Sequence, residues 1–147
     1  MTSLMTHSNP IVAEALTWVD TPYHHAAKLK GSGVDCAQLL YAVFIDALHL
    51  VPPIDFSEYP SDWMWHRSEE IFLSHVQTSA QEVFDPQPGD VAMFKWGHCF
   101  AHGSIVMDWP FVIHACVRTK KVTLIDARQG KFADREVRFF RVDGEGA

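Results

Sequence analysis

The sequence predicts an α+β domain in which N-terminal helices pack on a C-terminal antiparallel sheet of about five strands. Apolar residues recur at helical spacing in the first 50 positions, whereas they alternate with a period of two after residue 90. The three cysteines are odd in number, which argues against a disulfide framework. A chain of 147 residues can bury its own core, so we expect a single domain spanning 1–147.

Two helices are predicted before residue 51, separated by a loop over 21–34. The first begins at Pro10, preceded by the capping residues Ser8 and Asn9. The second should run from Cys36 to Leu50, where the following prolines end it. Its apolar positions are Cys36, Leu39, Leu40, Val43, Phe44, Ala47 and Leu48. A weaker third helix is predicted over 67–80, followed by a turn at 85–90.

The second half of the chain predicts strands. The candidate segments are "VAMFKW", "HGSIVM", "FVIHACV", "KVTLID" and "EVRFFRV", at 91–96, 102–107, 111–117, 121–126 and 136–142. Because the helices come first and the strands follow, the order favours an α+β domain over alternating βαβ units.

Composition excludes several classes of function. The net charge is −6, and no basic cluster is longer than "RTKK" at 118–121, so we expect no nucleic-acid partner. No stretch approaches the roughly 20 apolar residues of a membrane span. The first ten residues lack the pattern of a signal peptide, so we expect synthesis and folding in a reducing cytoplasm.

Cys36 is the first candidate for chemistry. Asp35 can cap the second helix, which puts Cys36 in its first turn, where backbone N–H groups and the helix dipole favour a thiolate. The alternative is a structural cysteine that continues the apolar stripe. A nucleophilic thiol needs a base, so the histidines decide between the two.

Two histidines lie within predicted strands. If the loop is 108–110, Met107 faces Phe111, and alternation puts His102, Ser104, His114 and Cys116 on one face. The opposite face then carries the apolar core residues. His102 and His114 become diagonal neighbours, about 7–8 Å apart at the backbone. Cys36, His102 and His114 could thus supply a nucleophile, a base and an orienting residue.

A metal site is the competing interpretation of these residues. His98, Cys99, His102, His114 and Cys116 are all side chains that zinc accepts. Their spacing matches none of the usual zinc signatures, so we expect no metal and no other cofactor.

The ordered motifs "TPYHHAAKLKGSGVDCAQLLYAVF", "PQPGDVAMF", "AHGSIV" and "FVIHA" resemble the signature of NlpC-type cell-wall cysteine peptidases, over about residues 10–142. The forms "TPYHH", "GVDC" and "PPIDFSEYPSDW" are most similar to the branch found in tail-tip proteins of phages and gene transfer agents.

This resemblance implies a papain-like fold and hydrolysis of peptidoglycan stem peptides between D-glutamate and diaminopimelate. It implies that Cys36 is the nucleophile, His102 the general base and His114 the orienting residue, with Tyr23 and Asp35 lining the substrate site. It also implies action at the cell wall, within a phage-type or gene transfer particle, with tail-tip proteins as partners.

Two departures from the family pattern bear on specificity. Ala37 and Gln38 replace the usual Ser-Gly after the Asp-Cys pair, and "HGSIV" has Gly103 and Ser104 where a branched residue and then glycine are usual. Three alternatives stay open: a zinc-dependent hydrolase or metal-binding domain, a catalytically silent tail module, and a cysteine amidase of related fold.

Overall fold

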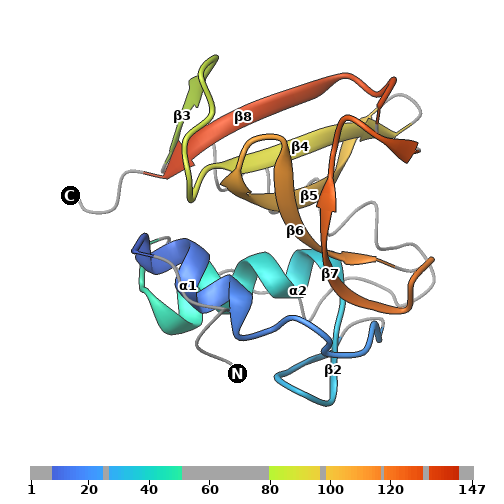
Figure 1. Cartoon of the computed structure of the whole chain (residues 1–147). Coiled ribbons are helices and arrows are strands. Elements are labelled where there is room, and N and C mark those ends of the chain that lie inside the picture. Colours follow the sequence, from blue (N-terminus) through green and yellow to red (C-terminus); the bar gives the residue numbers. More distant parts are fainter. Residues whose placement is uncertain are drawn as a thin grey trace.

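The computed structural model describes residues 8–24, 27–50, 80–96, 99–116, 118–130 and 133–142. Within them, two helices lie against one face of a twisted antiparallel sheet (Figure 1). The helical elements are α1 (Pro10–Leu16), α2 (Cys36–Tyr41) and the π-helix η2 (Ala42–Ala47). None of the described helices is long and apolar enough to cross a membrane.

Six strands form the main sheet in the order β3-β8-β4-β5-β6-β7. Their bounds are β3 (Ala80–Val83), β4 (Val91–Trp96), β5 (Cys99–Asp108), β6 (Phe111–Cys116), β7 (Lys121–Asp126) and β8 (Val137–Val142). A small hairpin of β1 (Lys28–Leu29) and β2 (Gly33–Val34) precedes α2. The sheet therefore has one strand more than predicted, and the predicted loop over 21–34 contains a hairpin.

Helix α1 forms as predicted. Asn9 caps it by accepting hydrogen bonds from the N–H groups of Ile11 and Val12, and Pro10 occupies the first turn, where its missing N–H costs nothing. The Asn9 amide also donates to the carbonyl of Pro88 at 3.0 Å. The cap thus ties the helix to the "PQPGD" turn that leads into β4.

The second helix differs from its prediction after Tyr41. It continues as a π-helix to Ala47 instead of an α-helix to Leu50. The wider turn changes which side chains face the core: Ala42, Val43, Phe44 and Ile45 are all buried, whereas Ala47 is exposed. The predicted third helix over 67–80 lies outside the described residues, apart from Ala80, which begins β3.

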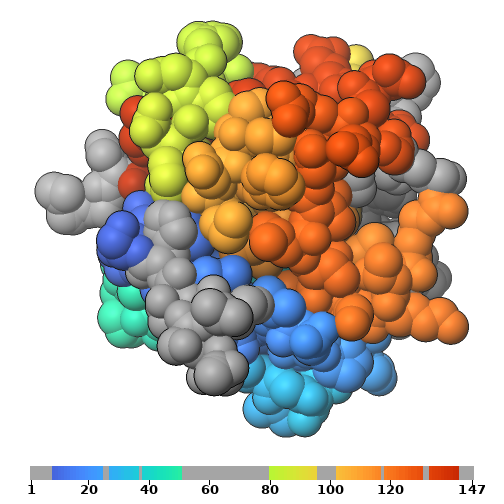
Figure 2. All heavy atoms as spheres, viewed as in Figure 1, coloured from blue at the N-terminus to red at the C-terminus, as the bar shows by residue number. Residues whose placement is uncertain are grey.

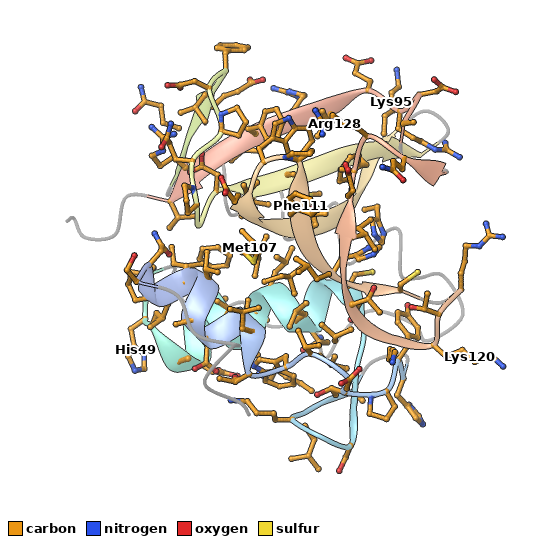
Figure 3. All side chains as sticks on the ribbon, viewed as in Figure 1. His49, Lys95, Met107, Phe111, Lys120 and Arg128 are labelled. Atoms are coloured by element: carbon orange, nitrogen blue, oxygen red, sulfur yellow. The ribbon has the colours of Figure 1, made fainter. Side chains whose placement is uncertain are left out.

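The hairpin of β5 and β6 keeps the predicted register over most of its length. Ile105 pairs with Ile113, as expected. The predicted pair of Met107 with Phe111 is wrong, because Asp108 takes that place and a bulge leaves Met107 as the extra residue. Met107 packs against the helix-side core (Figure 3), while Phe111 is 41% exposed.

Both faces of the sheet bury apolar side chains, where the sequence suggested one core face. The larger cluster joins α1, α2 and η2 to Val91, Met93, Ile105 and Ile113. A second cluster on the other face consists of Ala92, Phe94, Val106, Val112 and Ala127. Half-buried residues pack on this second core, among them Trp109 in the turn after β5 and Phe139 of β8, whose rings meet edge to face at 4.7 Å.

Candidate active site

Cys36 is in the first turn of α2, as predicted. Asp35 Oδ1 accepts a hydrogen bond of 2.9 Å from the N–H of Gln38, and the Asp35 carbonyl accepts one of 2.9 Å from Leu39. Asp35 is buried and acts as the N-cap. The Cys36 thiol is not in a disulfide, and its residue is 4% exposed within the helix-side core.

Residues 21–24 connect the main sheet to the β1–β2 hairpin, which leads into Cys36. Tyr23 bridges Val34 in parallel, and Val34 donates to the carbonyl of Pro22 at 3.0 Å. On its other side, Tyr23 donates its N–H to Lys120 at 2.8 Å. Figure 2 shows the blue N-terminal atoms directly against the orange atoms of the β6–β7 region. Tyr23 therefore lies between the strand that leads to Cys36 and the turn that follows β6.

His102 and His114 form a direct contact. Their atoms His102 Nε2 and His114 Nδ1 are 2.8 Å apart, and the ring centroids are 5.0 Å apart with the planes nearly perpendicular, at 88°. His102 is partly buried opposite Phe94 of β4, and His114 is almost fully buried, at 1% exposed. The diagonal placement predicted from strand alternation thus becomes a hydrogen bond between two rings.

Burial decides where the proton of this pair resides. Burial lowers the pKa of His114 to about 4, so its ring is neutral at neutral pH. When His102 carries a full positive charge, both of its nitrogens are donors, and His102 Nε2 must donate to His114 Nδ1. The remaining proton of His114 is then on its Nε2. This arrangement can hold a charged imidazole at position 102 and leave its Nδ1 for a second partner.

The same burial predicts a pH-dependent stability. Above the unfolded pKa of 6.5, His114 is neutral in both states; as the pH falls from 6.5 to about 4, the unfolded chain takes up the proton first, so stability is lost. The loss at full protonation is about 3 kcal/mol. His114→Gln should remove this part of the decline in urea unfolding between pH 7 and pH 4.5. An equal decline in both proteins would contradict the burial argument.

Helix α2 lies against the strand that carries His102. Leu40, one turn after Cys36, contacts Gly103, the residue that follows His102. The helix-side core also joins Cys36 to Ile113 and Ala115, on either side of His114. The first turn of α2 therefore packs in the same core as the two residues that flank His114.

The side chains that the sequence offered as zinc ligands form no metal site in the part of the chain that the structure describes. No three His, Cys, Asp or Glu side chains there could together hold a metal ion. His98 lies outside that part. Cys116 is a buried free thiol on β6, two residues beyond His114.

No family model matches the sequence, and no curated protein matches it. Solved structures do share its fold. The NlpC/p60 domain of the peptidoglycan hydrolase SagA is 19% identical, with a TM-score of 0.59 over 94% of this chain and 99% of that chain. A protein from Staphylococcus aureus, described as similar to lipoprotein and of the NLP/P60 family, is 18% identical, with a TM-score of 0.63. The match covers 98% of this chain and 47% of that protein, so this chain spans about half its length.

The fold is that of the NlpC/P60 domains. The prediction of an NlpC-type α+β fold, with helices on an antiparallel sheet, is confirmed. The structure also explains one departure from the family pattern. Glycine at position 103 faces Leu40, while Ser104 is fully buried and donates its hydroxyl to the carbonyl of Ala92 at 3.1 Å.

Proposed function

We propose that this protein is a cysteine peptidase of the NlpC/P60 type that hydrolyses peptidoglycan stem peptides. The observation that carries the proposal is the contact of His102 with a buried, neutral His114, next to the helix that begins at Cys36. Of the two similar structures, one is described as the NlpC/p60 domain of a peptidoglycan hydrolase and the other as a protein of the NLP/P60 family. The sequence resemblance assigns Cys36, His102 and His114 to the roles that this geometry suits.

In the proposed reaction, His102 Nδ1 accepts the thiol proton and the Cys36 sulfur attacks the carbonyl carbon of the scissile amide. N–H groups at the start of α2 stabilise the oxyanion that forms beside Cys36. His102 then gives its proton to the leaving amine, and a thioester remains on Cys36. Water, deprotonated by His102, releases the acid and regenerates the thiol.

His114 makes and breaks no bond in this scheme. Its Nδ1 holds His102 in one orientation and stabilises the imidazolium, in the way that the third residue of a triad does. We expect the sulfur of Cys36 within about 4 Å of His102 Nδ1. A crystal structure with the thiol turned away from the His102 ring would contradict this assignment.

Substrate recognition is proposed for Tyr23 and Asp35. Tyr23 is half-buried beside the strand that leads to Cys36, where it can line a peptide cleft. Asp35 is buried and its Oδ1 caps α2, so a role in substrate recognition would be additional to that hydrogen bond. We propose the D-glutamyl–diaminopimelate bond as the target. Because Ala37 and Gln38 replace the usual Ser-Gly, stem peptides with and without a free amino end should be compared as substrates.

We further propose that the activity serves a phage-type tail or gene transfer particle. The support is the similarity of "TPYHH", "GVDC" and "PPIDFSEYPSDW" to tail-tip proteins. Purified particles should contain the protein together with tail-tip proteins, as quantified by immunoblotting across a density gradient. Its absence from particles that retain wall-degrading activity would contradict this placement.

The zinc-dependent alternative predicts the opposite response to two reagents. Cleavage of muropeptides should survive EDTA and be lost after iodoacetamide, because the proposed chemistry needs a free Cys36 thiol and no metal. Elemental analysis after chelation provides the control for residual zinc. Activity that is lost with EDTA and restored by zinc would establish the metal-dependent alternative.

A further inference from the structure

Helix α2 comes close to the sheet at Gly103. A Cβ atom at this position would lie 2.6 Å from Leu40 Cδ1 and 3.2 Å from Met93 Sδ. Both neighbours are already packed, since Leu40 is 0% and Met93 1% exposed. A methyl group at position 103 therefore has no empty volume to enter, and α2 or these side chains would have to move.

The need for glycine here comes from packing. Gly31, Gly89 and Gly130 have positive φ angles, and Gly103 is not in this group. Alanine could therefore adopt the backbone conformation of position 103 without strain. What alanine would add is the Cβ atom, and glycine within a strand commonly marks the close approach of another element.

The contact joins the two halves of the proposed site. Leu40 is four residues after Cys36, so the two side chains lie on the same side of α2. Gly103 directly follows His102 on β5. Along one edge, β5 is fixed to β4 by the pairing of His102 with Phe94 and by the Ser104 hydroxyl bond to Ala92. An added methyl group would therefore press on Leu40 from a strand that the sheet holds in place.

We propose that Gly103 is a positioning residue whose missing side chain sets the distance at which Cys36 meets His102. The inference rests on the proposed function, because it assumes that these two residues react as a pair. An added methyl group would push Leu40, and with it the first turn of α2, away from β5. A displacement of about 1 Å at a reacting group can cost about 10²-fold in rate.

The test is Gly103→Ala, with two readouts. Turnover of a defined stem peptide should fall at least about tenfold in kcat, with KM little changed, since alignment and not binding is disturbed. The rate of Cys36 alkylation by iodoacetamide, followed against pH by peptide mass mapping, should shift toward that of an ordinary thiol. If Gly103 had a purely structural role, Gly103→Ala would change neither the pH profile of Cys36 alkylation nor the ratio of kcat to KM.

A second substitution that restores the space at position 103 makes the test specific. Leu40→Val removes the atom that a Cβ would meet, so the double variant Gly103→Ala/Leu40→Val should recover most of the alkylation profile and of kcat. If Gly103→Ala alone does not fold, the double variant carries the test, because it should fold and keep the reactive thiol. A double variant that fails to recover either property would overturn the inference.

Val106→Ala is the matched control. Val106 is on the same strand, is fully buried and belongs to the cluster on the other face. It should lower stability without changing the alkylation profile of Cys36. If the wild-type thiol is reactive and Gly103→Ala leaves its profile and kcat unchanged, this inference alone is wrong. If the wild-type thiol itself behaves as an ordinary one, the proposed function fails and the inference fails with it.

Discussion

His102→Ala is expected to bring hydrolysis of a defined stem peptide to background. His102 takes the thiol proton and returns it to the leaving amine, so its loss removes both proton transfers from the reaction. General acid–base terms are worth about 10²–10⁴-fold, and the members of a catalytic unit fail together instead of additively. Turnover should be measured at equal folded fraction.

His114→Gln is the matched comparison for this prediction. A glutamine side chain can still accept a hydrogen bond from His102 Nε2, so the variant should keep part of the activity and fall nearer the low end of that range. If His114→Gln were as inactive as His102→Ala, His114 would do more than orient its neighbour. If His102→Ala retained more than a few per cent of wild-type turnover, His102 would not be the base.

Cys36→Ala is the second substitution with a large expected effect, again to background turnover. No other group of the proposed mechanism can form the thioester, so the loss should match or exceed that of His102→Ala. Folding should survive, because only a sulfur atom is removed from the first turn, and the Asp35 cap that starts the helix remains. The melting temperature should therefore change little.

Cys116→Ala provides the control for thiol loss. Cys116 is also buried and free, and it lies on the strand that carries His114, but the proposed mechanism gives it no role. Its variant should keep wild-type turnover. If Cys116→Ala were inactive while Cys36→Ala remained active, the assignment of the nucleophile would be wrong.

Features decided by neighbouring residues were predictable from the sequence. Asn9 and Pro10 mark the start of α1, and Asp35 marks that of α2, because capping depends on the next three or four residues. Strands β4 and β7 have the predicted bounds. Alternation along β5 and β6 was enough to bring His102 and His114 together, because the bulge lies beyond the pairs that set their register.

Features decided by distant packing were not predictable. The π-helix, the bulge at Met107 and the second core each depend on elements that the local pattern does not contain. Strand β3 was missed because its four residues, Ala80–Val83, carry no clear alternation, and its partner β8 is far along the chain. Gly103 could be singled out as a glycine in an apolar strand, but only the structure identifies Leu40 as its reason.

The central claim is that His102, held by His114, activates the thiol of Cys36, and the pH dependence of Cys36 alkylation tests it most directly. Iodoacetamide labels thiolates, and peptide mass mapping reads Cys36 and Cys116 separately in the same sample. The account predicts that labelling of Cys36 in the wild type is half-maximal well below the ordinary thiol value of about 8.5, and that His102→Ala abolishes this early rise. A rise centred near 8.5 in the wild type, unchanged in His102→Ala, would contradict the account.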